Sequence, residues 1–263
     1  MRKLAYIFMA ATLLWASCTK EQPTVTVHFT VAQDGWEYQM PTKSAGDGSA
    51  ATQMMVGVFD AQGNAIEGLK TVVTHNAATG FDFDLQLVGT LSYKIVLWAQ
   101  SPDRYVNSAS WTAAGLGAIS LTGYSALSAE ADDAFTAFTT VPAGSNAVTV
   151  DLVRPFAQVS VATTADLTGI TQAQLQFTGV PAVYNACTGT ASGSQTISVA
   201  GAPILGAYAT DYIYIGYAYV PARGETATAT INLGTSANPA IRTKSVQNLP
   251  LKANYRTNIL GNI

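Results

Sequence analysis

The sequence predicts an all-β protein with two β-sandwich domains in tandem, and three observations support this prediction. Short runs in which apolar and polar residues alternate recur along the chain, whereas helical periodicity is weak nearly everywhere. Turn-forming residues separate these runs, as at residues 60–64, which contain Gly63 and Asn64. The phase of the alternation changes at Arg154-Pro155, and because proline is disfavoured inside a sheet, we place the domain boundary there.

The N-terminal half begins with a predicted strand at about residues 24–31. Val25, Val27, Phe29 and Val31 alternate there with polar residues, which predicts one buried and one solvated face. Further strands of this half are expected at residues 54–59, 81–87, 93–100 and 148–152.

The C-terminal half has strand patterns at residues 156–161, 174–180, 212–220 and 227–233. The run at residues 212–220 is apolar on both faces, with Tyr214, Gly216 and Val220 on one and Tyr217 on the other, so it belongs inside a sandwich. The closing segment, residues 251–263, alternates again and is predicted to be a half-buried strand that continues to the last residue.

Three stretches rich in Gly, Ala and Ser are predicted to be loops, at residues 40–52, 105–135 and 186–210. The first has no periodicity and is expected to be exposed and open to proteases. Residues 129–138, which overlap the second loop, are expected to form one or two helical turns.

The first 17 residues are predicted to be a secretory signal. A basic dipeptide at residues 2–3 precedes an apolar run, residues 4–15, that is too short to span a bilayer as a helix. Two small residues then precede Cys18, which is the lipobox arrangement, although Trp15 stands where an aliphatic residue is usual. We therefore expect lipid attachment at Cys18, which would anchor the protein to a membrane; ordinary cleavage with an incidental cysteine is the alternative.

Composition limits the remaining possibilities. Removing 17 of the 263 residues leaves 246, which suits two ordinary domains or one large all-β domain. Without the two basic residues of the signal, 11 Lys and Arg face 16 Asp and Glu, and no basic patch indicates a nucleic-acid partner. Charged residues make up only 11% of the chain, so hydroxyls and backbone groups are expected to solvate the surface, as suits an exported protein.

No set of residues with catalytic or metal-binding spacing is visible, so we predict no enzyme, no cofactor and no metal. His28 and His75 each lack a second ligand at metal spacing. Asp82 and Asp84 share one strand face, where they could bind Ca²⁺ or form an acid–base pair, or simply be solvated. Cys187 is expected to be a buried apolar thiol without a disulfide partner.

Two further groups of residues have both a structural and a binding interpretation. Asp132-Asp133 could cap a short helix or bind a metal ion. Trp36, Trp98 and Trp111 could stack on a sugar, although Trp98 lies on an apolar strand and is expected in the core.

Four segments carry a resemblance to a known family. They are residues 93–100 (YKIVLWAQ), 132–135 (DDAF), 152–158 (LVRPFAQ) and 251–259 (LKANYRTNI), with a Gly-Asn pair at residues 261–262. In this order and spacing they resemble the fimbrillin-like lipoproteins of Bacteroidia, which include the major and accessory subunits of type V pili. The resemblance covers nearly the whole chain after Cys18 and implies two transthyretin-like β-sandwich domains, residues 18–153 and 154–263.

The resemblance implies assembly by strand exchange rather than catalysis. In polymerising members a trypsin-like protease cuts a loop after the first strand, and a strand from a neighbouring subunit fills the groove that opens. Here that loop contains Lys43 as its only basic residue, and no arginine occurs between Cys18 and Arg104, whereas the family is cut after arginine. Lys43 and Ser44 are therefore the candidate processing site.

Strand exchange would involve both ends of the chain. The candidate residues are Val25, Val27, Phe29 and Val31 in the first strand and Tyr255, Ile259 and Ile263 in the closing strand. The closing strand either pairs within its own sandwich, which we favour, or swings out and donates itself to a neighbour.

The resemblance leaves two main hypotheses for function. The first is a structural or terminal subunit of a cell-surface fimbria, with other fimbrial subunits as partners and an outer-membrane lipid anchor. The second is a non-polymerising outer-membrane lipoprotein of the same fold that binds a glycan or a host protein.

Overall fold

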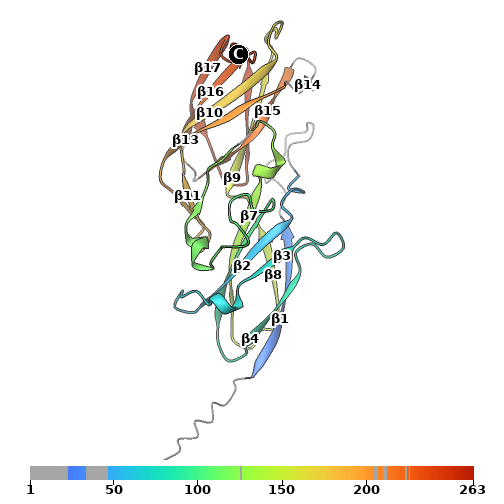
Figure 1. Cartoon of the computed structure of the whole chain (residues 1–263), viewed down its shortest axis with the longest axis vertical. Coiled ribbons are helices and arrows are strands. Elements are labelled where there is room, and N and C mark those ends of the chain that lie inside the picture. The colour runs from blue at the N-terminus through green and yellow to red at the C-terminus, as the bar shows by residue number, and fades with distance from the viewer. Residues whose placement is uncertain are drawn as a thin grey trace, which may run out of the picture.

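The protein is almost entirely β, which confirms the predicted fold class. This computed structural model describes residues 23–33, 47–124, 126–203, 206–209, 212–222, 224 and 226–263. Two β-sandwiches follow one another along the long axis, with the N-terminal sandwich at the bottom of Figure 1 and the C-terminal sandwich at the top. Among the described residues the only helices are three short 3₁₀ turns, η1 (Glu67–Leu69), η2 (Ala114–Gly117) and η3 (Glu130–Asp132).

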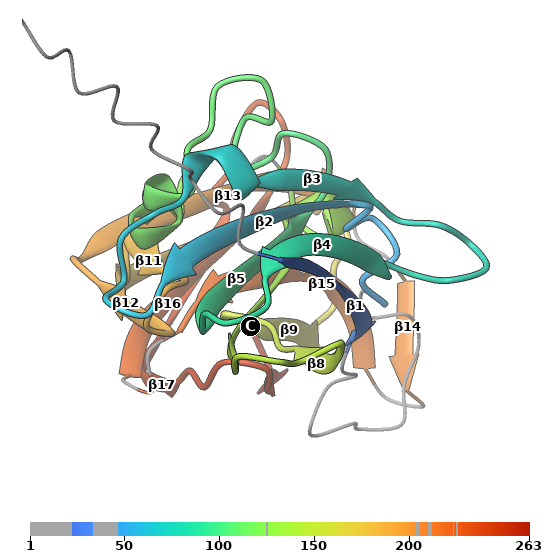
Figure 2. The ribbon, with the colours of Figure 1, turned by 90° about the horizontal axis from the view of Figure 1, so that it is seen from below.

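The N-terminal sandwich consists of a three-stranded sheet, β4-β1-β8, facing a four-stranded sheet, β3-β2-β5-β7. Its strands are β1 (Thr24–Gln33), β2 (Gln53–Asp60), β3 (Thr71–Thr74), β4 (Phe83–Val88), β5 (Tyr93–Gln100), β7 (Ala134–Val141) and β8 (Ala147–Leu152). Apolar side chains from both sheets meet between them in one buried cluster that includes Phe29, Met54 and Leu97. Figure 2 shows β1 between β4 and β8 when the molecule is seen from this end.

The C-terminal sandwich pairs the sheet β14-β15-β9-β18 with the sheet β13-β10-β16-β17. Its strands are β9 (Phe156–Thr163), β10 (Gln172–Val180), β13 (Gln195–Pro203), β14 (Gly206–Ala209), β15 (Tyr212–Pro221), β16 (Thr226–Gly234), β17 (Arg242–Pro250) and β18 (Arg256–Gly261). A second buried cluster, which includes Val161, Leu175 and Ile231, fills the space between these sheets.

The two sandwiches share one strand order. In each, the first strand pairs antiparallel with one later strand, β1 with β4 and β9 with β15. In each, the first strand also pairs parallel with the last, β1 with β8 and β9 with β18. The four-stranded sheets correspond as well, with β3-β2-β5-β7 matching β13-β10-β16-β17. The two halves are thus the same sandwich twice, although the sequence contains no short internal repeat.

A third cluster joins the sandwiches. A small sheet, β12-β11-β6, lies beside it, made of β6 (Ile119–Ser120), β11 (Val183–Asn185) and β12 (Thr190–Ser192). The ring of Trp98 lies 5.9 Å from that of Tyr105 and 5.8 Å from that of Tyr184, while Tyr105 stacks on Phe156 at 5.7 Å. These rings come from both halves of the chain, so the connection between the sandwiches is packed with apolar residues.

Several expectations for the loops were wrong. Residues 129–138 make a single 3₁₀ turn, η3, and then enter β7, because Ala134–Val141 pair along the whole of β5. Residues 186–210 contain β12, β13 and β14. The sequence pattern also missed β17, an edge strand whose side chains are mostly exposed, so it shows no apolar alternation. The predicted boundary at residues 153–154 stays a prediction, with β8 ending at Leu152 and β9 beginning at Phe156.

The expected strict alternation along β15 is also wrong, because a bulge interrupts it. The pairing with β9 shifts register between Tyr214 and Gly216. Tyr214 therefore joins Tyr217 in the cluster between the sandwiches, while Ile215 enters the C-terminal core.

Gly216 is expected to be needed for this bulge. Its φ is +150°, and an added Cβ would lie 3.2 Å from Oγ of Ser128 and 3.3 Å from Cβ of Leu127. Gly216→Ala should lower the free energy of unfolding by about 1–3 kcal/mol, measured by urea denaturation. The control is Gly117→Ala, because nothing lies within 4 Å of that Cβ position. Equal stability of the two variants would contradict the assignment.

Candidate strand-exchange site

The first strand, β1, is the centre of its sheet. Thr24 to Phe29 pair antiparallel with β4, and His28 to Gln33 pair parallel with β8. Strands in a sheet lie about 4.8 Å apart, so β4 and β8, which pair with β1 from opposite sides, are separated by roughly twice that distance. Removal of β1 would therefore leave a groove as wide as one strand.

The inner face of β1 is deeply buried. Val27, Phe29 and Val31 have relative exposures of 1%, 0% and 8%, and Val25 is partly buried. The ring of Phe29 stacks on that of Phe83 in β4 at 4.6 Å. All four candidate residues thus face the N-terminal core, and the groove without them would be lined by apolar side chains.

The outer face of β1 is tied to β4 by side chains. The amide of Gln86 donates to Oγ1 of Thr26 at 2.6 Å, and Nδ1 of His28 lies 2.7 Å from a carboxylate oxygen of Asp84. The carboxylate of Asp82 accepts a hydrogen bond from the backbone N–H of Val31 at 3.1 Å. Asp82 and Asp84, considered above for calcium or acid–base chemistry, therefore bind the first strand.

Four residues singled out from the sequence lie outside the described residues: Cys18, Trp36, Lys43 and Ser44. Lipid attachment and processing therefore stay predictions. The described part of the predicted loop, residues 47–52, begins with Asp47, whose carboxylate accepts a hydrogen bond from the N–H of Ser49 at 2.9 Å. The side chain of Ser49 and, second, this N–H lower the pKa of Asp47 by hydrogen bonding to its carboxylate.

The closing segment is shorter as a strand than predicted. Residues 251–255 form a turn in which Asn254 has a φ of +63°, and only Arg256–Gly261 form β18. The backbone oxygen of Tyr255 accepts from Gln158 at 3.0 Å, Ile259 is 8% exposed in the C-terminal core, and the N–H of Ile263 donates to Oγ1 of Thr163 at 3.2 Å. In this structure the segment belongs to its own sandwich.

Two of the resembling segments meet at the junction of the sandwiches. Arg154, 2% exposed, donates from Nε to both carboxylate oxygens of Asp133 at 3.0 and 2.9 Å, and its guanidinium lies 4.2 Å from the ring centre of Phe135. Burial raises the pKa of Asp133, while the charge and the hydrogen bonds of Arg154 lower it. Asp133 is thus held in an ion pair between the segments.

Asp132 lies beside a second arginine. Its carboxylate accepts from Nε of Arg104 at 2.6 Å, and Arg104 also donates to the backbone oxygen of Thr122 at 3.2 Å. The expected helix cap is therefore wrong, because η3 has no side-chain cap and both carboxylates bind arginines. Among the described residues no group of three His, Cys, Asp or Glu side chains could hold a metal ion.

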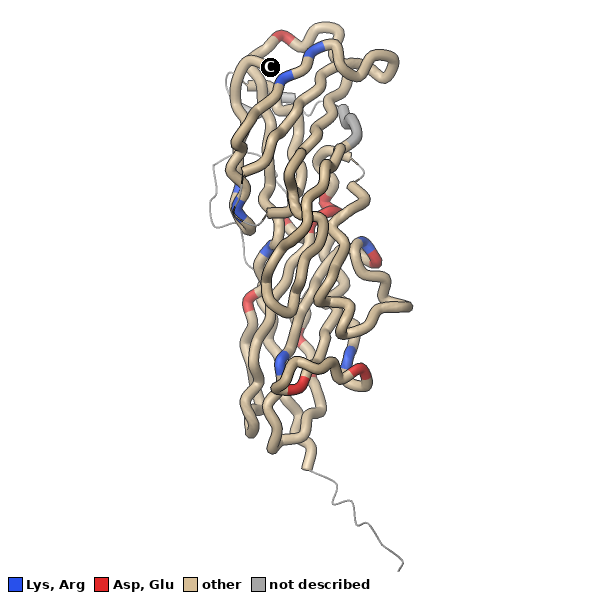
Figure 3. The backbone as a smooth tube through the Cα atoms, turned by 90° about the vertical axis from the view of Figure 1, so that its left-hand side faces the viewer, with Lys and Arg blue, Asp and Glu red and all other residues tan. Residues whose placement is uncertain are grey.

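A third junction carboxylate was missed by sequence reasoning. Glu130 accepts hydrogen bonds from the hydroxyls of Tyr217 and Tyr219, the second at 3.2 Å. Burial raises its pKa. Figure 3 shows how sparse charges are along the chain. The available signal was the acidic group of Glu130, Asp132 and Asp133 in an Ala-rich stretch, because carboxylates that become buried need partners.

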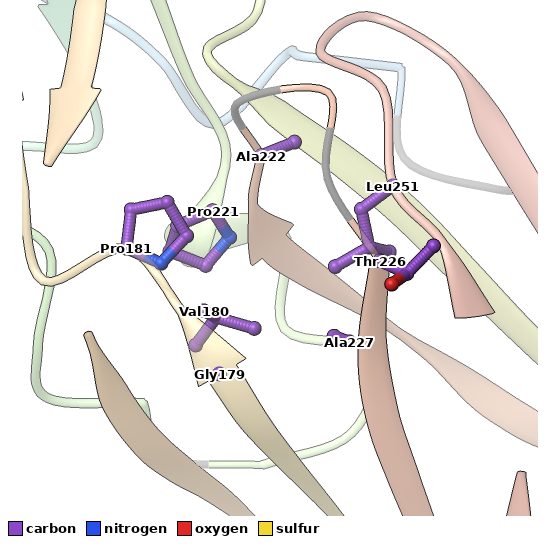
Figure 4. Close-up of a pocket in the computed structure, with 8 residues that line it drawn as sticks. All are labelled: Gly179, Val180, Pro181, Pro221, Ala222, Thr226, Ala227 and Leu251. Atoms are coloured by element: carbon purple, nitrogen blue, oxygen red, sulfur yellow. The ribbon is translucent and has the colours of Figure 1, made fainter. Parts of the chain in front are cut away.

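The remaining candidates are mostly structural. Trp98 is fully buried and donates from Nε1 to Gln100 at 2.8 Å, and Trp111 is 9% exposed. Cys187 is half-buried rather than buried, and its surroundings raise the thiol pKa. Figure 4 shows a small space between Val180, Ala222 and neighbouring residues; at about 10 Å³ it holds at most one water molecule. Within the described part of the chain, no helix is long and apolar enough to cross a membrane.

Comparison with known proteins gives a family first. The family of unknown function DUF6562 matches residues 19–263. The chain belongs to this family. No curated protein matches this DUF6562 chain.

Solved structures give the fold of the DUF6562 chain. A Bacteroides thetaiotaomicron protein named for polysaccharide binding has a TM-score of 0.56 at 13% identity, covering 86% of this chain and 80% of its own. The fimbrial anchor protein Mfa2 from Porphyromonas gingivalis has a TM-score of 0.52 at 14% identity, covering 84% of this chain and 82% of its own. A fimbrial assembly protein from Parabacteroides distasonis has a TM-score of 0.51 at 12% identity, covering 92% of each chain. The fold thus confirms the resemblance to fimbrillin-like proteins. The names of these neighbours describe binding, anchoring or assembly, and none describes an enzyme.

Proposed function

We propose that this protein is a structural or terminal subunit of a cell-surface fimbria, assembled by strand donation into the groove that β1 occupies. One observation supports this most directly. β1 is the first strand, yet it is the central strand of its sheet, and both of its neighbours come from later in the chain. A first strand can leave such a position without unthreading any other segment.

The groove would accept a strand with a defined pattern. A replacement strand gains backbone hydrogen bonds from β4 and β8 and must place apolar side chains where Val27, Phe29 and Val31 lie. A slip by one residue would turn these side chains to solvent, so register is strongly specified. On the outer face, Asp84 favours a hydrogen-bond donor at the position of His28.

The closing segment favours a terminal place in the fibre. β18 pairs with β9, and Ile259 packs in the C-terminal core, so the subunit keeps this strand for itself. A subunit that accepts a strand but retains its own suits an anchor or tip, and the neighbour Mfa2 is named as a fimbrial anchor. Acylation at Cys18 would hold the uncut subunit, with β1 in its groove, in the outer membrane. Cleavage between Lys43 and Ser44 would instead release β1 together with Cys18 and open the groove.

Deletion of residues 19–43 tests the groove. Because the deletion uncovers the apolar lining, the variant is expected to aggregate, and added peptide of residues 23–33 should restore a monomer in light scattering. A peptide with Phe29→Asp is the matched control and should not. A truncated protein that stays monomeric and equally stable would overturn the proposal.

The alternative is a non-polymerising outer-membrane lipoprotein that binds a glycan or host protein. It is favoured by the neighbour named for polysaccharide binding and by Phe138, which is 56% exposed on β7. A glycan array separates the two functions, since binding that is lost in Phe138→Ala would support the alternative.

A further inference from the structure

The free end of the N-terminal sandwich carries an apolar pocket. Its cavity of about 560 Å³ lies between the turn that follows β2 and the turn that joins β4 to β5. The apolar lining consists of Ile66, Leu69, Val88 and Leu91. Leu91 is 49% exposed, one of the largest exposures of an apolar side chain in the described chain. We call this group the tip pocket.

The tip pocket is built by fixed backbone contacts. The N–H of Leu91 donates to the oxygen of Val88 at 3.0 Å, and the N–H of Leu69 donates to that of Ile66 at 2.9 Å. The hydroxyl of Tyr93, a buried residue of the lining, accepts from the N–H of Val88 at 3.1 Å. Two turns with defined geometry therefore keep these apolar side chains exposed to solvent.

The two carboxylates at the pocket are engaged locally, and Gln62 and Ser92 complete its polar lining. Asp60 lines the pocket, but its carboxylate accepts two hydrogen bonds from Asn64, each at 2.8 Å. Glu67, in η1 between two lining residues, pairs with Lys70 at 3.2 Å. The lining thus favours an apolar ligand over a polar one.

The start of the described chain lies at the same end. The backbone oxygen of Pro23 accepts a hydrogen bond from the N–H of Gly89, the residue after Val88. Five peptide units separate Pro23 from Cys18, and an extended chain spans at most about 3.6 Å per residue, so Cys18 lies within about 18 Å of Pro23. If Cys18 is acylated, this end of the molecule faces the bilayer.

We propose that the tip pocket rests on the membrane and takes up an acyl chain of a bilayer lipid, so that the anchored subunit stands on the membrane surface. The proposal rests on the lipid anchor of the proposed function and concerns the uncut subunit, which keeps β1 in its groove and has accepted no strand. The bilayer is the occupant because the short segment between Cys18 and Pro23 keeps the pocket close to the hydrocarbon of the membrane. Leu91 and Val88 provide the contact. Because the C-terminal sandwich lies at the opposite end of the molecule (Figure 1), it would extend away from the membrane.

The test uses residues 18–263 with Cys187→Ser, coupled at Cys18 to a maleimide lipid in phosphatidylcholine vesicles. Hydrogen exchange is compared between tethered and untethered protein. Amides of residues 60–69 and 88–93 should exchange about fivefold more slowly when tethered, the ratio expected from burying about half a leucine side chain. Residues 235–241, at the opposite end, should not change.

A matched pair of variants identifies the contact. Leu91→Asp should abolish the slowing, whereas Ile241→Asp should leave it intact, because Ile241 is also 49% exposed but lies before β17 at the far end. No slowing in the tethered protein would overturn the proposal. If residues 60–69 and 88–93 of untethered protein already exchange as slowly as those of tethered protein, residues 18–22 are the occupant, and the proposal is overturned too.

The failure of this proposal and the failure of the lipid anchor are distinguishable. Mass spectrometry of the protein from native cells shows whether Cys18 is acylated, which tests the anchor alone. The synthetic tether tests the tip pocket whatever the native modification is.

Discussion

Arg154→Ala is expected to lower the free energy of unfolding by about 3–5 kcal/mol, because it leaves the buried carboxylate of Asp133 without its cation. Both side chains are almost completely buried, at 2% and 0% exposure, and the Nε of Arg154 contacts both oxygens of Asp133. The variant also loses the contact of the guanidinium with Phe135. Urea denaturation at neutral pH measures the loss.

The loss should depend on pH with a defined sign. Burial raises the pKa of Asp133, and Arg154 opposes this rise, so the folded-state pKa of Asp133 is higher still in Arg154→Ala. A carboxyl whose pKa is raised on folding stabilises the fold below its unfolded pKa, and that stability is lost as pH rises through the folded pKa. The variant should therefore be more destabilised at pH 8 than at pH 5. Arg154→Ala combined with Asp133→Asn should remove this difference, and an equal loss at both pH values in the single variant would contradict the ion-pair assignment.

Much of the fold follows from side-chain alternation. The strands at residues 93–100 and 148–152 alternate or are continuously apolar, because their side chains pack between sheets, and the structure contains β5 and β8 there. The exposed edge strand β17 and the strand β7 escaped detection because pairing with a neighbour, rather than local pattern, determines them. The bulge at Gly216 likewise depends on contacts with Ser128, which lies 88 residues earlier in the chain.

The candidate site was only partly predictable for the same reason. The inner face of β1 was visible in Val27, Phe29 and Val31, since a core-facing strand face must be apolar. The partners on its outer face were not, because the contact of His28 with Asp84 joins residues 56 positions apart. The ion pair of Asp133 with Arg154 joins residues 132–135 to residues 152–158. It explains physically why these two motifs occur together, which the sequence alone did not show.

Phe29→Ala is the second large effect expected. Phe29 is fully buried at the centre of β1, where it stacks on Phe83, so truncation removes a ring and leaves a cavity in the N-terminal core. Such changes cost about 3–5 kcal/mol. The matched control is Phe138→Ala, because that ring is 56% exposed, and its loss should change the free energy of unfolding by less than about 0.5 kcal/mol.

The position of the loss matters as much as its size. Because β4 and β8 each pair within their sheet only with β1, loosening β1 should speed hydrogen exchange in β4 and β8 first. The C-terminal sandwich, whose core is a separate cluster, should be affected later. Amides of β9 and β10 in Phe29→Ala should therefore keep the exchange rates of the unaltered protein. If β9 and β10 exchange faster together with β4, the two sandwiches unfold as one unit, and β1 cannot be released from its groove while the rest of the molecule stays folded.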